Sequence, residues 1–306
     1  MLKGLSFQQH RDGHFASVDR VRAASAPHTP LQNHLLAALP SECLERLLPS
    51  LKPVPLPLGW VIHGAGQREK YLFFITAGIV SRVYVTETGE SAAFAFTGNE
   101  GVIGVASFLG GESTPSQAVV ISPGYAYRLE AGLLKGEFEQ DGPLPQLLLR
   151  YTQALIAQTG QIVACNGRHS LEQQLCRMIL SCLDRLPSNE LMMTQELIAA
   201  MLGVRRESVT ESAGKLQHAG MIHYHRGHIA VFDRPGLEAR ACECYGVVKR
   251  VHDCLLFPEN MIGHTVVQDT GRPYGKVSVK TPRARMRCQA VRSTVPALAH
   301  RSGARD

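Results

Sequence analysis

The sequence has no long hydrophobic run, because no stretch of its 306 residues reaches the roughly 18 apolar residues that a membrane helix requires. The longest charge-free stretch of helical character, residues 151–167, is interrupted by Gln, Thr and Gly. The first residues include Lys3, His10, Arg11 and Asp12 and contain no apolar segment of the kind found in signal peptides. We therefore expect a cytoplasmic protein with no membrane partner.

Cys-x-x-Cys pairs are also missing. The eight cysteines are scattered and include no Cys-x-x-Cys pair, which argues against a disulfide framework and suits reduced thiols in a cytoplasm. Cys242 and Cys244, with Cys254, offer thiols for zinc, but their spacing matches no standard zinc finger. We expect neither a metal site nor a cofactor.

Excess positive charge is absent from most of the chain. The formal net charge is +6, and residues 258–306 carry nine Lys and Arg against three Asp and Glu. The rest of the chain is therefore formally neutral, so an argument for nucleic-acid binding must rest on local patterns. The proline-containing, basic segment 251–306 is expected to be a disordered tail.

What the sequence does contain is a clear change of pattern along the chain. Residues 1–30 show no periodicity and are expected to form a flexible arm. Short aromatic or β-branched runs (71–76, 79–85 and 92–96) follow, separated by glycine-containing turns. This pattern predicts a small antiparallel barrel or jelly roll over residues 31–140.

Residues 141–167 predict one long helix whose apolar positions alternate at spacings of four and three. This spacing is typical of a coiled-coil seam between two protomers, although a helix packed on its own barrel has the same pattern. The predicted dimer-interface residues are Leu144, Leu148, Tyr151, Leu155, Gln158 and Ile162, with Cys165 continuing the series.

Two short helices with a glycine turn between them are predicted within residues 193–219. Thr194 is a good N-cap, and Leu202-Gly203 supplies the turn, which together describe a helix-turn-helix. The first turn of the second helix would reach DNA base edges. A solvated, charged helix in a bundle is the alternative.

Residues 221–232 favour the first of these interpretations, because they predict two short strands around Arg226-Gly227. A β-hairpin directly after a helix-turn-helix is a winged helix, and Arg226 at its tip is placed for phosphate contacts. The DNA-binding domain is expected to span residues 168–250.

The order of barrel, long helix and winged helix resembles the Crp/Fnr superfamily of bacterial transcription regulators over roughly residues 31–250. The resemblance is carried by residues 59–66, 71–75, Gly78, 100–104, 194–198, 206–209 and 233–238. It implies an α+β fold with an N-terminal antiparallel β-roll of the cyclic-nucleotide-binding type, a long dimerisation helix and a C-terminal winged helix-turn-helix.

The resemblance and the pattern together nominate a set of DNA-binding residues. Arg206 is the best candidate for bidentate contact with guanine O6 and N7, and Glu207 is placed to accept from a cytosine amine. The remaining candidates for contact with bases or phosphates are Thr194, Gln195, Arg205, Ser208, Thr210, Glu211, Lys215 and Arg226.

The β-roll departs from the members of this superfamily that bind cyclic AMP. Val102 stands where those proteins place a Glu that holds the ribose, and no arginine occurs between Arg82 and Arg128 to grip the cyclic phosphate. A buried phosphate without a cationic partner would carry an uncompensated charge. We expect the roll to sense an unidentified effector other than cyclic AMP.

These observations predict a homodimeric, sequence-specific DNA-binding regulator that recognises a near-palindromic duplex site. The resemblance adds RNA polymerase as an expected partner. A ligand-sensing adaptor whose winged helix binds protein is the alternative. No Ser-His-Asp order, metal-ligand spacing or phosphate-cradling glycine loop is legible, so we do not expect an enzyme.

Overall fold

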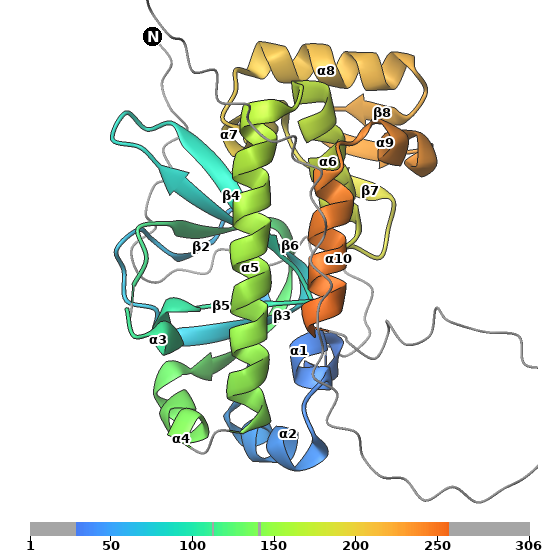
Figure 1. Cartoon of the computed structure of the whole chain (residues 1–306). Helices are drawn as coiled ribbons and strands as arrows, with labels where there is room; N and C mark the ends of the chain where they lie inside the picture. The colour runs from blue at the N-terminus through green and yellow to red at the C-terminus, as the bar shows by residue number, and fades with distance from the viewer. Residues whose placement is uncertain (1–28, 112, 140–141, 257–306) are drawn as a thin grey trace, which may run out of the picture. The chain divides into compact units, whose positions relative to one another are not determined.

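The computed structural model describes residues 29–256, apart from 112, 140 and 141. The predicted N-terminal arm, up to residue 28, and the predicted tail, from residue 257, lie outside the described residues. Figure 1 shows the order of the elements from the small N-terminal helices to the last described helix. None of the described helices is long and apolar enough to cross a membrane.

The described part of the chain begins with short helices that pack onto the sheet domain. They are a 3-10 turn at Pro30–Gln32, α1 (His34–Ala37), α2 (Ser41–Leu47) and a second 3-10 turn at Leu48–Ser50. Asn33 caps α1 by accepting from the backbone of Leu35 and Leu36. Its Nδ2 also donates to the carbonyls of Ile75 and Gly101, both over 2.8 Å. One buried side chain therefore fixes these helices to the sheet.

An antiparallel β-roll follows, as the sequence predicted. Strands β1, β6, β3 and β4 pair in that order, while β2 pairs with β6 and β5 with β3. Helices α3 (Ala106–Leu109) and α4 (Leu134–Glu139) accompany them. The strands are β1 (Lys52–Leu56), β2 (Val61–His63), β3 (Tyr71–Val85), β4 (Ser91–Thr97), β5 (Val102–Ile103) and β6 (Gln117–Glu130).

Strand β3 joins two segments that the sequence analysis separated at Ala77-Gly78. Instead of a turn, this dipeptide forms an irregularity at which the register with β6 shifts. Gly78 has φ of +87°, and a Cβ there would lie 2.6 Å from the carbonyl oxygen of Ser122. Glycine therefore permits a bent, continuous strand.

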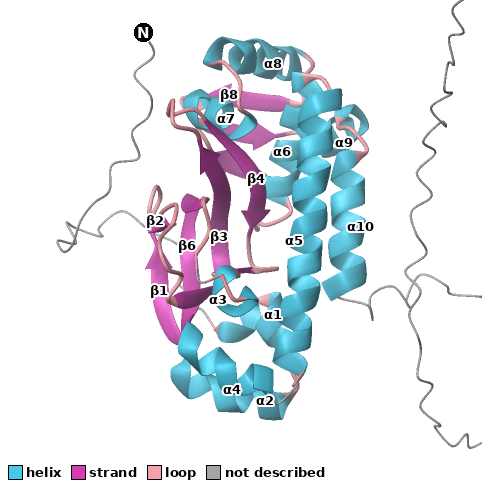
Figure 2. Cartoon of the chain, turned by 60° about the vertical axis from the view of Figure 1, so that its left-hand side comes forward, coloured by secondary structure: helices cyan, strands magenta, loops and turns pink. Residues whose placement is uncertain are grey.

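The second half of the described chain is mainly helical. It contains α5 (Pro143–Arg168), α6 (Leu171–Leu183), β7 (Glu190–Met192), α7 (Gln195–Leu202), α8 (Arg206–His218), β8 (Ile222–His225), β9 (His228–Val231), α9 (Arg234–Arg240) and α10 (Cys244–Leu256). Figure 2 shows α5 with strand β4 on one side and α10 on the other. Helix α10 crosses residue 250, where we expected the DNA-binding domain to end and a disordered tail to begin.

The apolar seam of α5, predicted to lie between two protomers, is already covered within one protomer. Leu144, Leu148, Tyr151, Leu155, Gln158 and Ile162 are all buried within the protomer. The first four belong to a core formed with the β-roll, and the Gln158 amide donates to the Phe96 carbonyl of β4 over 3.5 Å. Because these side chains already have partners in their own chain, their burial does not require a second protomer.

Candidate nucleic-acid interface

Helices α7 and α8 form the predicted helix-turn-helix. Thr194 caps α7, where its Oγ1 accepts from the Leu197 amide over 3.2 Å. Gly203 ends α7 in the left-handed region, at φ of +67°, and thereby allows the sharp turn into α8. The local signals that predicted the two helices are therefore the ones that form their ends.

Burial of one face of α8 determines which side chains reach solvent. Val209, Ala213 and Leu216 are buried in a core shared with α6 and α7. Ser208 is half-buried. The other predicted contact residues of the helix and its N-cap are exposed, namely Arg205, Arg206, Glu207, Thr210, Glu211 and Lys215. The structure therefore brings these predicted residues together on one helix.

Two of these residues are joined to α7, and sequence reasoning missed this connection. Arg206 Nη1 lies 2.8 Å from Glu196 Oε1, and Thr210 Oγ1 donates to Gln195 Oε1 over 2.8 Å. Glu196, the acidic residue in the first turn of α7, thus holds the guanidinium of the principal base-reading candidate.

The wing follows α8 directly. Strands β8 and β9 pair antiparallel around the Arg226-Gly227 turn, and β7 adds a third strand that the sequence analysis did not predict. Arg226 has φ of +48° and Gly227 has φ of +81°, which matches the tight hairpin turn that the strand twist favours. Tyr224 Oη donates to the Met193 carbonyl over 2.8 Å and ties the wing to the start of α7. Arg226 is thereby presented, exposed, at the wing tip.

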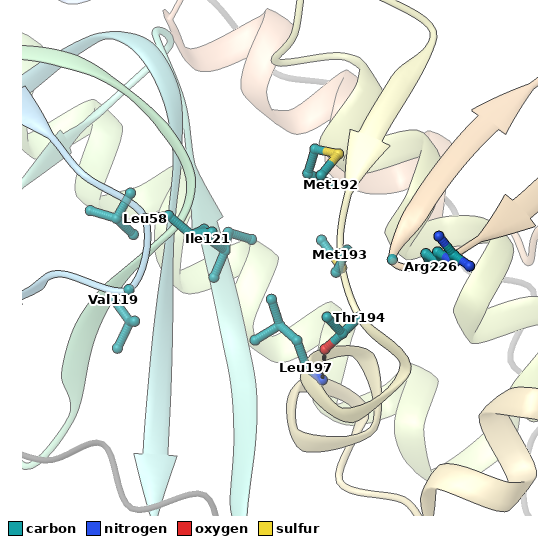
Figure 3. Close-up of a pocket in the computed structure, with 11 residues that line it drawn as sticks. Leu58, Val119, Ile121, Met192, Met193, Thr194, Leu197 and Arg226 are labelled. Carbon is teal, nitrogen blue, oxygen red and sulfur yellow. Dashed lines mark hydrogen bonds between the residues drawn. The ribbon is translucent and has the colours of Figure 1, made fainter. Parts of the chain in front are cut away.

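A pocket of about 230 Å³ lies between the β-roll and the wing (Figure 3). Its walls are mainly apolar and come from both parts of the chain. The side chains labelled in Figure 3 are Leu58, Val119 and Ile121 from the roll and Met192, Met193, Thr194, Leu197 and Arg226 from the DNA-binding part. The contact between the two parts is therefore incomplete where the wing turn and the start of α7 face the roll.

Residues 100–106, which include the segment 100–104 that carries the resemblance, are here called the effector cassette, and buried ionisable side chains anchor them. Arg82 donates through Nη2 to the Val102 carbonyl over 3.0 Å, and Glu69 Oε2 accepts from the Ala106 amide over 2.7 Å. His63 Nε2 lies 3.1 Å from Glu69 Oε1. Burial lowers the pKa of His63 to about 4 and raises the pKa of Glu69, so the environment disfavours charge on both.

Arg82 adds to what the sequence indicated about this cassette. No arginine lies inside it, but the guanidinium of Arg82 on β3 lies against it and is almost fully buried. Val102 of β5 is fully buried. The polar side chains around the cassette therefore contact its backbone from the adjacent strands and turns.

Comparison with known proteins agrees with this architecture. Residues 53–141 match the family model of the cyclic nucleotide-binding domain, and residues 173–240 match that of the Crp-like helix-turn-helix domain. The global nitrogen regulator of Synechococcus elongatus is 24% identical over 184 residues, which are 57% of this chain and 83% of that protein.

Solved structures show the same fold. FixK2 from Bradyrhizobium japonicum superposes with a TM-score of 0.56 at 17% sequence identity. The match covers 63% of this chain and 98% of the FixK2 chain. A Crp/Fnr-family regulator from Eubacterium rectale superposes with a TM-score of 0.55 at 18% sequence identity. The match covers 70% of this chain and 98% of the regulator's chain. These relatives are regulators rather than enzymes. With a cyclic nucleotide-binding domain and a Crp-like helix-turn-helix in one chain, the protein belongs to the Crp/Fnr superfamily of transcription regulators.

Proposed function

We propose that the protein is a homodimer that binds a near-palindromic duplex DNA site through α8 and the wing. The observation that carries this proposal is the exposed first turn of α8, where Arg205, Arg206 and Glu207 share the surface that such helices place in the major groove. Arg226, at the wing tip, is a candidate for phosphate contact. The superfamily also supports RNA polymerase as a partner.

The proposed dimer uses a stripe of α5 different from the seam that the sequence suggested. Leu149, Ile156 and Val163 are 51%, 67% and 66% exposed and lie seven residues apart. Large apolar side chains that repeat every seven residues on one helix face are typical of a two-helix contact. A second copy of α5 would cover this stripe.

Gly160 provides a second observation in favour of this dimer surface on α5. A glycine inside a helix costs about 1 kcal/mol relative to alanine, and a Cβ at Gly160 would meet nothing within 4 Å in the protomer. The protomer therefore gives no packing reason for glycine here, whereas close approach of a second helix does.

For the β-roll we propose an effector other than cyclic AMP. The proposal rests on Val102 at the position of the ribose-binding Glu and on Arg82, whose Nη2 already donates to a backbone carbonyl. Isothermal calorimetry with cyclic AMP and cyclic GMP tests it. We expect no appreciable heat of binding, and low-micromolar affinity for either nucleotide would overturn this part of the proposal.

The DNA-binding function is tested by selecting duplexes from a random pool with the full chain. A selected site should have two-fold symmetry with half-site centres about 34–36 Å apart, and affinity should fall steeply with added salt. A protein-binding adaptor would select no sequence and would show no such salt dependence.

A further inference from the structure

Three cysteines and a histidine from distant parts of the chain converge where α5 ends and α10 begins. The ligand atoms of Cys165, His169, Cys242 and Cys244 all lie within 4.8 Å of one another. Cys165 Sγ lies 3.4 Å from Cys242 Sγ, and Cys244 Sγ lies 3.5 Å from His169 Nδ1. Cys165 and His169, rather than Cys254, are thus the neighbours of the Cys242-x-Cys244 pair.

The fold explains why these four residues meet. Cys165 and His169 are four positions apart at the end of α5, and His169 is the C-cap, whose amide donates to the Cys165 carbonyl over 3.0 Å. Cys242 and Cys244 lie between α9 and the first turn of α10. Because α10 packs along α5 (Figure 1), this connection is brought to the end of the long helix.

Side-chain donors are directed at two of the sulfur atoms. All three cysteines are buried. Arg177 of α6, itself buried, donates through Nε to Cys165 Sγ over 3.3 Å, and Gln161 Nε2 donates to Cys244 Sγ over 3.0 Å. Burial raises the pKa of the Cys242 and Cys244 thiols, so these donors, one of them a buried cation, stabilise thiolates once a metal ion replaces the protons.

His169 is oriented as metal-binding histidines are. Its Nε2 lies 3.3 Å from Glu243 Oε2, while its Nδ1 faces Cys244 Sγ. A histidine that ligates a metal through one ring nitrogen usually gives the other to a carboxylate or carbonyl, which fixes the ring. Glu243 supplies such a carboxylate from between the two cysteines.

We propose that Cys165, His169, Cys242 and Cys244 form a structural site for a single zinc ion. Four ligands from protein side chains and no open position describe a closed tetrahedral site of the Cys₃His type. With Zn–S bonds of about 2.3 Å, tetrahedral sulfur ligands are about 3.8 Å apart. The Cys165–Cys242 separation of 3.4 Å would therefore lengthen slightly, and the longest separations, which are at most 4.8 Å, would shorten by up to about 1 Å. Three thiolates and Zn²⁺ carry one net negative charge, which the guanidinium of Arg177 neutralises.

The compactness of the cluster favours one ion over an iron–sulfur cluster. A cluster places its own iron and sulfide atoms between the cysteines and therefore holds their sulfurs further apart than a single ion does. The proposed zinc joins the last turn of α5 to the start of α10, directly before α6 and the DNA-binding elements. It thereby clamps α10 onto α5. This inference does not depend on the proposed function.

The test is the metal content of the full chain, purified under reducing conditions without added chelator and measured by mass spectrometry. We expect one zinc per chain in the wild type and background levels in a Cys242→Ser and Cys244→Ser double variant. Cys43→Ser, which alters a buried thiol on α2 outside the cluster, is the matched control and should keep its zinc. Cobalt exchanged into the wild type should show the visible bands of tetrahedral thiolate coordination.

A second variant and a stability measurement complete the test. His169→Gln, in a half-buried position, should still fold by circular dichroism and should bind zinc at least about tenfold more weakly. Chelation should lower the Tm of the wild type but not that of the double variant. A metal-free wild-type chain that gives no tetrahedral cobalt spectrum would overturn the proposal. So would bound iron with acid-labile sulfide, or a Cys165–Cys242 disulfide in the reduced preparation.

Discussion

Glu100 and Arg185 form an ion pair between the β-roll and the DNA-binding part of the chain. Arg185 Nε donates to Glu100 Oε1 over 2.8 Å, and the two side chains are only 9% and 13% exposed. Glu100 is the first residue of the effector cassette, whereas Arg185 follows α6. Arg185 lowers the pKa of Glu100 against the opposing effect of burial, so the pair is charged. The pair therefore provides a direct polar connection from the cassette to the helices that carry the winged helix.

We predict that breaking this pair destabilises the protein strongly, because the remaining charge stays buried. Glu100→Gln or Arg185→Met should each lower the free energy of unfolding by about 3–5 kcal/mol, measured by urea denaturation. The double variant should lose less than the sum of the two. Glu238→Gln, which removes the exposed partner of Arg234, is the matched control and should cost under about 1 kcal/mol. Additive losses in the double variant would show that the two residues act independently.

A second prediction concerns base reading. Arg206→Ala should leave the fold unchanged and weaken discrimination at one position of each half-site by about 1–3 kcal/mol. Glu196→Gln removes the partner that holds Arg206 in the free protein. Because exposed pairs contribute at most about 1 kcal/mol, this change should retain binding or strengthen it up to about fivefold. Fluorescence anisotropy with the selected duplex at fixed salt measures both.

The two variants check each other. If Arg206→Ala binds the selected site as tightly as the wild type, α8 does not read the DNA through this residue. A large loss of affinity in Glu196→Gln would mean that the ion pair positions Arg206 for binding, contrary to the prediction. Arg226→Ala is expected to weaken selected and random duplexes by similar factors and to reduce the salt slope by about one.

The winged helix could be predicted from the sequence because its signals are local. The cap at Thr194, the turn at Gly203 and the Arg226-Gly227 hairpin each depend on neighbours within a few residues. What covers the α5 seam could not be predicted from the sequence, because a helix that lies between a sheet and a second helix has apolar positions on more than one face. Spacing shows that a face is apolar but does not show what covers it.

Helix α10 and the cysteine–histidine cluster were missed for a related reason. We placed the end of the DNA-binding domain near residue 250, because the family resemblance ends there and the following segment is basic and contains prolines. The cluster joins residues separated by more than 70 positions, so only tertiary packing brings them together. The four-residue spacing of Cys165 and His169 was the one sequence signal that would have found the second ligand pair.

His252 on α10 gives the protein a predicted pH dependence. Its side chain is buried, and neither ring nitrogen has a hydrogen-bond partner among the described residues. Burial lowers its pKa to about 4, and Arg185 acts in the same direction while Glu100 opposes it. Between the pKa of an unfolded histidine, about 6.5, and about 4, the unfolded chain binds a proton that the folded chain does not. The free energy of unfolding should therefore be highest above about pH 6.5 and should decline as the pH falls from there to about 4.

The lowered pKa of His252 determines how much stability is lost on acidification. A shift from about 6.5 to about 4 corresponds to about 3 kcal/mol of unfolding free energy between these two pH values. His252→Leu should be nearly neutral at pH 7, since the ring makes no hydrogen bond, and should flatten the loss of stability between pH 6.5 and 4. Urea midpoints at several pH values measure the slope. An unchanged slope in the variant would assign the acid sensitivity to other groups.

The last prediction separates the two faces of α5. Ile156→Glu with Val163→Glu should give folded monomers with much weaker DNA binding, because both positions are solvent-exposed in the protomer and carry the proposed dimer stripe. Leu148→Glu is the matched control. It introduces a charge into the core between α5 and the β-roll and should unfold the chain rather than dissociate it. Sedimentation velocity and circular dichroism distinguish these outcomes.

Gly160→Ala sharpens the same test without adding charge. If Gly160 faces only solvent, alanine should raise the free energy of unfolding of the monomer by up to about 1 kcal/mol, through its higher helix propensity. If a second α5 approaches closely, the added methyl group should instead weaken the dimer, and the dissociation constant from sedimentation should rise. Dimers that persist unchanged in both Gly160→Ala and the double glutamate variant would place the interface on another surface. In that case the spacing of Leu149, Ile156 and Val163 would need a different explanation.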